Sequence, residues 1–287
     1  MLDTGCSMLD NFIRVFCFMP TAHINDIDIY YEIHGSGFPL VFAYGLGGNT
    51  DMWSGQIEAL SEHYRFIVWD PRGHGRSDSP QGSDQYGMQI SAEDLYGLLN
   101  HLGIEKAFVG GLSMGGGIAT RFAVSYPERV AALLIIDSAS ASGLPIKPEI
   151  RKMREKTIAL AKTRGMAAVA DYIIEANPNL KSQGEASTEA YQRLRHMFLD
   201  LNAVGYANTV RALIDDNFST DKLSMLSMPT LVLVGENDPA LEAARLTHRN
   251  IPGSRLVVLP GAGHLSNKDC PEAFNAGILE FLEQAAI

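Results

Sequence analysis

The sequence predicts an α/β fold: a mostly parallel sheet with helices on both faces and a helical insertion. Two observations carry this prediction. Short apolar runs typical of buried strands alternate with segments of helical periodicity, the pattern of βαβ units. One long segment, residues 142–222, contains helical patterns but no convincing strand. The chain has 287 residues, 46% of them hydrophobic, which suits one large domain with such an insertion.

Seven segments have the composition of strands. The first, residues 27–33, alternates apolar and polar side chains with a period of two, so it predicts a half-buried strand. The other six have continuous apolar interiors, as expected for parallel strands covered on both faces. They span residues 39–44, 65–70, 107–111, 132–137, 230–234 and 255–259.

Helical patterns separate these strands. Residues 91–102 begin at Ser91, which is suited to an N-cap, and place leucines on one face. Residues 114–125 follow a strand directly, and residues 271–284 close the chain with apolar side chains at helical spacing. We expect these helices to cover the two faces of the sheet.

The domain organisation follows from the one break in this alternation. Residues 142–222, with helical patterns at 149–163 and 188–201, form a predicted helical cap between two parts of one α/β core, residues 21–141 and 223–287. We interpret the cap as a lid over the carboxyl edge of the sheet. An ordinary helical decoration is the alternative.

Residues 1–20 form a predicted N-terminal extension. Their apolar stretch, residues 12–19, is broken by Arg14 and preceded by the acidic Asp3 and Asp10, and no Ala-x-Ala cleavage site follows it. We therefore expect a disordered or loosely docked extension rather than a secretory signal.

The acidic composition argues against several partners. A formal net charge of -10 and a pI of about 5.2 disfavour nucleic acid and anionic membrane surfaces. The cysteines, Cys6, Cys17 and Cys270, are scattered and form no CxxC motif, so neither a disulfide framework nor a zinc site is indicated. No apolar run reaches the roughly 20 residues that span a bilayer. These features fit a cytoplasmic protein.

The strongest functional signal is a G-x-S-x-G motif, Gly111-Leu112-Ser113-Met114-Gly115. It lies where a predicted strand meets a predicted helix, the context in which this motif presents a nucleophilic serine on a sharp turn. Residues two positions either side of the serine must lack side chains, because the turn leaves no room for them. The alternative is a glycine-rich turn without catalysis. We expect Ser113 to be a nucleophile.

A serine hydroxyl needs a general base within hydrogen-bond reach. His264 lies directly after the last predicted strand, in the sequence Gly261-Ala262-Gly263-His264, so a loop at the carboxyl edge of the sheet would carry it. His74 also follows a strand, but we interpret it as a structural turn residue. His264 is therefore the predicted base.

The base in turn needs a carboxylate that orients it. Asp238 lies just after the strand that ends at Val234, which gives the chain order Ser, Asp, His of this kind of triad. Asp137 also ends a strand and is the second candidate, and Glu236 is a weaker one. We interpret Asp70 as a structural carboxylate that pairs with an arginine, Arg72 or Arg76.

Acyl transfer also needs backbone N–H donors for the oxyanion. The amide of Met114, next to the nucleophile, is one candidate. Leu46, in the glycine-rich loop Gly45-Leu46-Gly47-Gly48, is the second. This loop matches neither G-x-G-x-x-G nor a phosphate-binding GK[ST] motif, and no HExxH spacing occurs, so the sequence indicates no nucleotide, metal or other cofactor.

Together these residues resemble the α/β-hydrolase superfamily from about Ile24 onward. Residues 69–78, WDPRGHGRSD, are similar to the family's strand-end loop. Residues 263–267, GHLSN, followed by PEAF at 271–274, are similar to its histidine loop and final helix. The resemblance implies a mostly parallel eight-stranded sheet with a helical cap. Within the superfamily, the chain most resembles the 3-oxoadipate enol-lactonase-like and small carboxylesterase group.

Three positions refine the resemblance. The family usually has His-Gly at the oxyanion loop, whereas this chain has Tyr44-Gly45, which changes the surroundings of the oxyanion loop but keeps its backbone donor. Carbon–carbon bond hydrolases of the meta-cleavage type commonly have asparagine before the nucleophile, where this chain has Leu112. Serine rather than aspartate at position 113 argues against haloalkane dehalogenases and epoxide hydrolases.

The sequence therefore predicts a hydrolase that cleaves a small-molecule ester or lactone through an acyl-enzyme and needs no cofactor. A carbon–carbon bond hydrolase and a non-catalytic ligand-binding protein are the alternatives, and a homo-oligomer stays open. An arginine of the cap turned toward Ser113 would favour a substrate with a carboxylate, and its absence would favour neutral esters. The candidates are Arg151, Arg154, Arg164, Arg193, Arg195 and Arg211.

Overall fold

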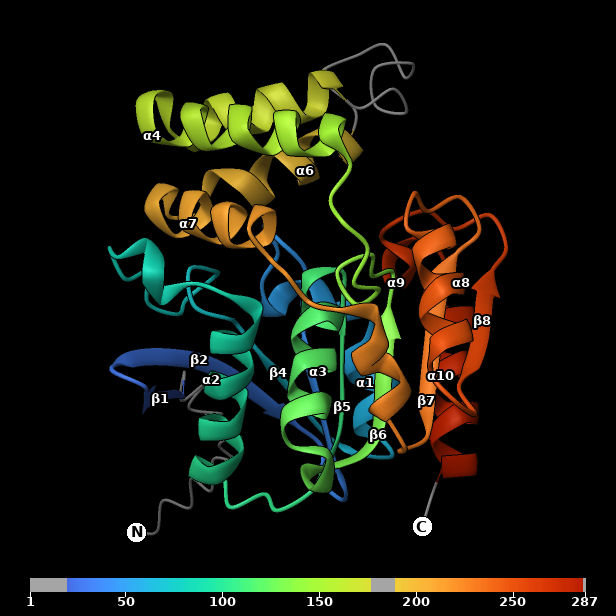
Figure 1. The fold of residues 1–287 in the computed structure, drawn as a ribbon. Helices are drawn as coiled ribbons and strands as arrows, with labels where there is room; N and C mark the ends of the chain where they lie inside the picture. The colour runs from blue at the N-terminus through green and yellow to red at the C-terminus, as the bar shows by residue number, and fades with distance from the viewer. Residues whose placement is uncertain (1–19, 177–188, 286–287) are drawn as a thin grey trace, which may run out of the picture.

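The computed structural model describes residues 20–176 and 189–285, and these form an eight-stranded sheet with helices on both faces (Figure 1). The strand order is β1-β2-β4-β3-β5-β6-β7-β8. Strand β2 pairs antiparallel with β1 and with β4. Every pairing among β3 to β8 is parallel. The predicted fold class is confirmed.

Each of the seven predicted strands is present, and one further strand precedes them. The strands are β1 (Thr21–Ile24), β2 (Ile27–His34), β3 (Pro39–Ala43), β4 (Arg65–Trp69), β5 (Ala107–Leu112), β6 (Val130–Ile136), β7 (Thr230–Gly235) and β8 (Arg255–Leu259). Strand β1 has only four residues, too few to show a period, and it joins β2 through a turn in which Asn25 and Asp26 have positive φ.

Two layers of helices cover the sheet. The helices around the core are α1 (Ser54–Ser61), α2 (Met88–His101), α3 (Met114–Ser125), α8 (Leu241–Asn250), α9 (Ser266–Asp269) and α10 (Pro271–Ala285), and short 3₁₀ helices lie at Thr50–Trp53, Ser83–Gln85, Pro127–Arg129 and Thr220–Met225. Leu95 of α2 and Phe122 of α3 belong to one buried cluster, and Leu60 of α1 and Phe274 of α10 to another. Helices α2 and α3 therefore cover the opposite face from α1 and α10.

The predicted N-cap at Ser91 is wrong. Helix α2 begins three residues earlier, at Met88, with Gly87 at the cap position. The N–H of Ser91 already donates to the carbonyl of Gly87, at 2.9 Å. The buried side chain of Met88 lies where a β-carbon on Gly117 of α3 would come within 2.6 Å of its sulfur. This packing on α3 outweighs the capping preference of serine.

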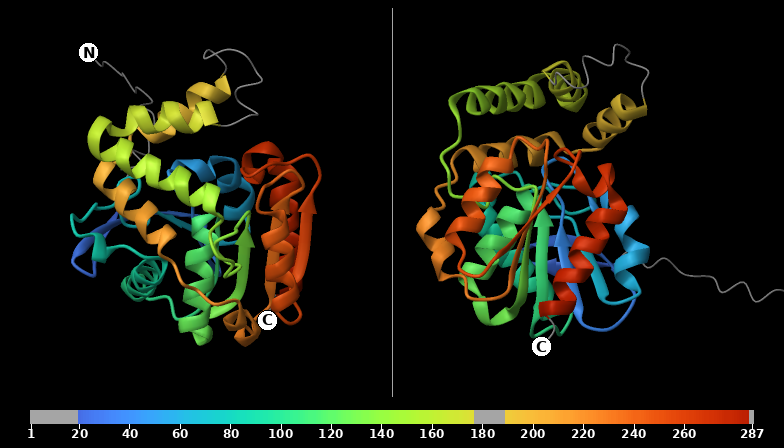
Figure 2. Two further views of the ribbon diagram at one scale, coloured as in Figure 1. Left: turned by 45° about the horizontal axis from the view of Figure 1, so that its top comes forward. Right: turned by 90° about the vertical axis from the view of Figure 1, so that its right-hand side faces the viewer.

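Three helices lie over the carboxyl edge of the sheet: α4 (Pro148–Ala176), α6 (Glu189–Leu199) and α7 (Ala203–Ile214) (Figures 1 and 2). The backbone of α4 leaves helical geometry at Gly165, where φ is 77°. No strand occurs among the described residues between 142 and 222. Val169, Tyr206 and Val210 form part of a separate buried cluster that joins these helices to one another.

Backbone atoms of α7 lie in close contact with backbone atoms of the core. A β-carbon on Gly205 would lie 2.8 Å from both Cα and the carbonyl oxygen of Gly73, in the loop after β4. Gly73 itself has a φ of 78°. Two glycines are therefore required at this contact.

Three stretches lie outside the description: residues 1–19, 177–188 and 286–287. They include nearly all of the predicted N-terminal extension, together with Cys6 and Cys17. Within residues 20–176 and 189–285, Cys270 forms no disulfide. Among the helices that the structure describes, none is long and apolar enough to cross a membrane.

Candidate active site

Ser113 lies on the sharp turn between β5 and α3, with φ 57° and ψ -114°. The carbonyl oxygen of Ala43 on β3 presses on this turn. A β-carbon would lie 2.6 Å from that oxygen if added to Gly111, and 2.1 Å from it if added to Gly115. The two glycines of the motif are therefore needed because neighbouring backbone occupies the space of a side chain.

Ile136, which ends β6, and Ser138, two residues later, hold the strained turn of Ser113 in place. The N–H of Ser113 donates to the carbonyl of Ile136, at 2.8 Å. The Ser138 hydroxyl donates to the carbonyl oxygen of Ser113, at 2.6 Å. A positive φ in a non-glycine residue costs free energy and persists only when surrounding contacts enforce it. The hydrogen bonds to Ile136 and Ser138, the two neighbours of Asp137 in the sequence, are such contacts.

His264 and Asp238 come from two loops and meet at Ser113. The Nε2 atom of His264 lies 3.1 Å from the Oγ of Ser113, and its Nδ1 atom lies 3.0 Å from each carboxylate oxygen of Asp238. The side chain of Asp238 is fully buried, whereas that of His264 is 45% exposed. The tautomer that donates from Nδ1 to Asp238 leaves Nε2 free to accept the serine proton.

The pKa of His264 is raised above its ordinary value. Burial of the ring lowers the pKa, but the hydrogen bond and the negative charge of Asp238 raise it by more. Asp238 is in turn held by the N–H of Ala240, at 2.8 Å. The carboxylate therefore both orients the imidazole and stabilises its protonated form.

The two other candidate acids have different partners. Asp137 is completely buried and accepts hydrogen bonds from the N–H of Gly235, at 3.0 Å, and from the N–H and hydroxyl of Ser266. Burial raises its pKa to about 7. Glu236 is exposed and accepts from the N–H of Gly261. Of the three acids, Asp238 is the one whose carboxylate contacts the ring of His264.

The loop after β3 runs directly beside Ser113. A β-carbon on Gly45 would lie 2.8 Å from the Cβ of Ser113, so only glycine allows this approach. The next residue is Leu46, and the turn closes through a hydrogen bond from Gly48 to Gly45, at 3.0 Å. Met114 opens α3, where the first N–H groups of a helix have no intrahelical acceptor. The structure thus brings both predicted oxyanion donors to the neighbourhood of the serine.

Tyr44, the residue that departs from the family pattern, is buried in the core. Its hydroxyl donates to the side-chain oxygen of Asn267, at 3.1 Å, and burial raises its pKa. The amide of Asn267 donates to Gln56 and to the carbonyl of Met52, each at 3.0 Å. Gln56 lies in no sequence motif and Asn267 only ends the histidine-loop segment, so their mutual contacts became visible only from the fold.

The loop at 70–78 is structural. His74 is buried, contacts the carbonyl of Arg72 through Nδ1, and has a pKa lowered by burial to about 4. Asp70 accepts from the backbone N–H groups of Thr50 and Arg76. Of the two arginines predicted as partners of Asp70, Arg76 contacts it, through its backbone N–H. Arg72 does not, because its Nε and Nη2 atoms each lie 2.6 Å from the buried carboxylate of Asp94.

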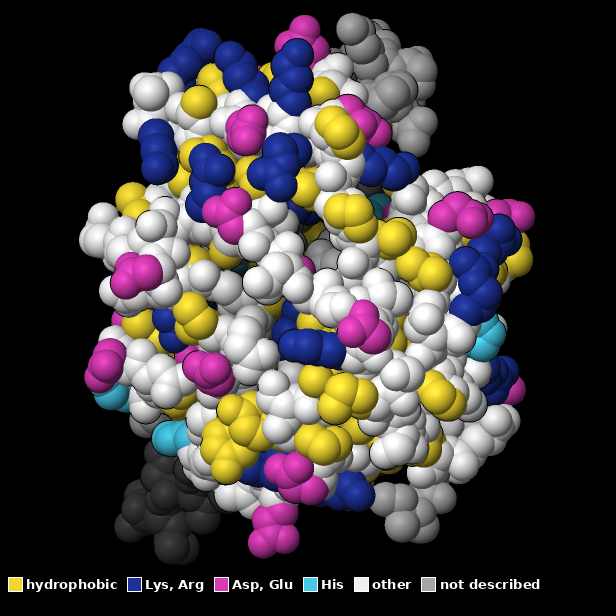
Figure 3. All heavy atoms as spheres, in the orientation of Figure 1, with side chains coloured by type: hydrophobic (Ala, Val, Ile, Leu, Met, Phe, Trp, Pro, Cys, Tyr) yellow, Lys and Arg dark blue, Asp and Glu magenta, His cyan; other side chains and the backbone are white. Residues whose placement is uncertain are grey.

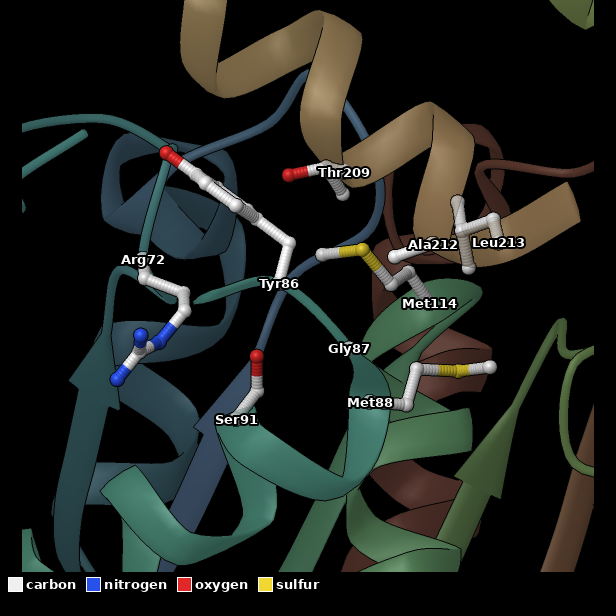
Figure 4. Close-up of a pocket in the computed structure, with 9 residues that line it drawn as sticks. All are labelled: Arg72, Tyr86, Gly87, Met88, Ser91, Met114, Thr209, Ala212 and Leu213. Carbon is white, nitrogen blue, oxygen red and sulfur yellow. The ribbon is translucent and has the colours of Figure 1, made fainter. Parts of the chain in front are cut away.

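A small, mostly apolar pocket lies between α2, α3 and α7 (Figure 4). The side chain of Met114 lines it, beside Met88 and Leu213. The hydroxyl of Thr209 also lines it and is buried without a hydrogen-bond partner among the described residues. A threonine within a helix gives no sequence signal, so this site was not predicted.

The candidate arginines between residues 142 and 222 have other contacts where the structure describes them. Arg154 and Arg151 donate to the carbonyls of Leu213 and Ile214 at the end of α7. Arg195 pairs with the exposed Asp171. Arg164 and Arg211 are exposed, and the side chain of Arg193 lies outside the description. Figure 3 shows Lys and Arg side chains gathered on the outer surface over α4.

Among residues 20–176 and 189–285, no group of three or more His, Cys, Asp and Glu side chains is arranged to hold a metal ion.

A doubly covered parallel sheet, with a strained serine at a strand–helix turn and a histidine and an acid on later loops, defines the α/β hydrolase class. A family profile for the alpha/beta hydrolase fold matches residues 39–154. The chain is 31% identical to 3-oxoadipate enol-lactonase 2 of Acinetobacter baylyi, over 92% of this chain and 96% of that protein. The chain belongs to the α/β hydrolase fold family.

Solved structures agree with this family. An esterase from Thermogutta terrifontis is 34% identical, with a TM-score of 0.80 over 91% of this chain and 95% of that one. The enol-lactonase from Burkholderia xenovorans LB400 is 28% identical, with a TM-score of 0.80 over 92% of this chain and 100% of that one. The resemblance to the enol-lactonase and esterase group is confirmed.

Proposed function

We propose that this protein hydrolyses a carboxylic ester or lactone through an acyl-enzyme on Ser113. The observation that carries the proposal is the continuous chain of hydrogen bonds from Ser113 through His264 to Asp238. The Oγ of Ser113 attacks the substrate carbonyl carbon while Nε2 of His264 takes the hydroxyl proton. Asp238 holds the imidazole in the required tautomer and stabilises its positive charge.

The tetrahedral intermediate then breaks down. The amides of Leu46 and Met114 hold its oxyanion, and His264 returns the proton to the departing alkoxide as the ester bond breaks. With a lactone, the alcohol stays attached to the acyl group. His264 next takes a proton from water, the hydroxide attacks the acyl carbon, and the proton passes to Ser113 as the carboxylic acid leaves.

We further propose that residues 142–222 act as a cap that chooses the substrate. Phe198 of α6 packs over the oxyanion loop, because a β-carbon on Gly47 would lie 3.2 Å from its ring. Leu46 also contacts the buried cluster of the cap helices. The described cap arginines contact helix ends, a surface aspartate or solvent. Neutral esters or lactones are therefore the proposed substrates.

The test compares Ser113→Ala with Ser83→Ala, a substitution at an exposed serine far from the motif. Substrates are a neutral chromogenic ester, a neutral lactone, a carboxylate-bearing lactone and a dienone acid. Ser113→Ala should lower kcat by several orders of magnitude without loss of fold, and Ser83→Ala should not. A fluorophosphonate probe should label the wild type and Ser83→Ala, but not Ser113→Ala.

Three results would contradict the proposal. Near-normal ester turnover by Ser113→Ala would show that Ser113 is not the nucleophile. Turnover of the dienone acid alone would identify a carbon–carbon bond hydrolase, and no turnover of any substrate by the wild type would favour a ligand-binding protein.

A further inference from the structure

The side chain of Asp137 accepts three hydrogen bonds beside the candidate site. One carboxylate oxygen accepts from the N–H of Gly235, at 3.0 Å. The other accepts from the N–H of Ser266, at 3.1 Å, and from its hydroxyl, at 2.6 Å. Gly235 ends β7, three residues before Asp238, and Ser266 lies two residues after His264. One carboxylate therefore joins the loops of the acid and the base.

The residues on either side of Asp137 hold Ser113, the third residue of the candidate site. The carbonyl of Ile136 accepts from the N–H of Ser113, and the hydroxyl of Ser138 donates to the carbonyl of Ser113. Asp137 itself has a positive φ of 45° and no exposed surface. Such a conformation is costly in a non-glycine residue and persists where contacts on every side enforce it.

We propose that Asp137 is a positioning residue, which fixes the loop of His264 against the turn of Ser113 while Asp238 alone contacts the imidazole. This inference rests on the proposed function, because it assigns Asp137 a part in the same reaction. It also gives a reason for a second buried acid near the first. A shift of about 1 Å between reacting groups can cost about 100-fold in rate, so the geometry of this loop matters.

Several titratable groups face Asp137. The charge of Asp238 raises its pKa and that of His264 lowers it, on top of the larger effect of burial. The Asp137 carboxylate in turn raises the pKa of His264, and also the pKa of Tyr44 and Cys270. Replacing Asp137 by an uncharged residue should therefore lower the pKa of His264.

The central experiment compares Asp137→Asn with Glu280→Gln, which removes an exposed carboxylate that pairs with Arg255. Asp137→Asn should lower kcat about 10- to 100-fold with little change in KM, because the amide cannot accept all three hydrogen bonds. The acidic limb of its kcat/KM profile should also move to lower pH. Glu280→Gln should leave both the rate and the limb unchanged.

Ser266→Ala provides the second variant, because it removes one of the three hydrogen bonds and keeps the carboxyl group of Asp137. It should lower kcat less than Asp137→Asn. The pKa of His264, measured by NMR in a Ser113→Ala background, should fall on adding Asp137→Asn. This measurement needs no turnover and only requires a folded protein. If Asp137→Asn does not fold, normal kcat in Ser266→Ala overturns the proposal.

Other outcomes also decide the question. Wild-type kcat and an unchanged pH profile in Asp137→Asn would overturn the positioning role. So would a loss as large as that of Asp238→Asn, because Asp137 would then act as the orienting acid. Both failures differ from failure of the proposed function, in which Ser113→Ala keeps its activity.

Discussion

The hydroxyl of Tyr44 donates to the side-chain oxygen of Asn267, at 3.1 Å, across 223 positions of the sequence. Tyr44 directly precedes the proposed oxyanion loop, and Asn267 lies three residues after His264. Gln56 extends the connection, since its side chain bonds both the carbonyl and the side chain of Asn267. A buried tyrosine thus links two loops of the site where the family usually has histidine.

Tyr44→Phe should therefore destabilise the protein by about 1 kcal/mol, because it leaves the buried oxygen of Asn267 without this donor. Activity should fall only a few-fold, since the ring still fills its place. Denaturant unfolding and kcat/KM on a neutral ester measure the two effects. Tyr64→Phe, which removes a hydroxyl from another tyrosine packed on Phe108, is the control and should change neither. Equal effects of the two variants would contradict the role of this hydrogen bond.

Asp238→Asn should lower kcat about 10⁴-fold, because the amide would favour the wrong imidazole tautomer. The fold should persist, because the amide oxygen can still accept from Ala240. Steady-state kinetics and circular dichroism measure these outcomes, with Glu236→Gln as the control. A loss below tenfold would indicate that another group orients His264.

His74 predicts a specific pH dependence of stability. Its pKa is about 4 in the folded protein and 6.5 when exposed, so below pH 6.5 the unfolded chain binds a proton that the folded chain does not. The stability it contributes is present above pH 6.5 and is lost as the pH falls toward 4. Between pH 7 and pH 5 this loss is about 2 kcal/mol.

His74→Gln isolates this effect. The difference in unfolding free energy between wild type and variant should be largest at pH 7 and should shrink toward pH 5. Denaturant unfolding at both values measures it, and His63→Gln, at an exposed position, should show no such trend. A constant difference for His74→Gln would show that the residue does not titrate as inferred.

Arg154→Ala tests the charge of the substrate. The guanidinium donates to the carbonyl of Leu213, where basic groups commonly satisfy the end of a helix, so its loss should lower stability by about 0.5–1 kcal/mol. Its kcat/KM should change by the same factor for a neutral ester and for a carboxylate-bearing lactone. Arg164→Ala, at an exposed position on α4, is the control. A selective loss with the charged lactone would show instead that Arg154 recognises a carboxylate.

Sequence reasoning succeeded where local chemistry dictates the outcome. Buried parallel strands need continuous apolar runs, so seven strands were predicted. The turn at Ser113 needs glycines at fixed positions, because the backbone at Ala43 occupies the space of their side chains. Such constraints act over a few residues and leave a pattern that can be read directly.

The remaining features depend on contacts between distant segments. The helix at Ser91 begins earlier because Met88 packs on α3. Arg72 pairs with Asp94 rather than Asp70, since helix α2 brings this carboxylate, 22 residues further along the chain, to the guanidinium. The connection of Tyr44 to Asn267 needs the whole sheet to form first. No local pattern encodes these partners.

The contact between Gly205 and Gly73 has a consequence for how the cap can be studied and altered. Alanine scanning looks for side chains whose removal weakens an interface, and neither of these glycines has a side chain to remove. The substitution Gly205→Ala would instead add a methyl group that forces the backbone of α7 away from the backbone at Gly73. This position therefore offers protein engineers a way to change how α7 packs on the core without substituting any residue of the candidate active site.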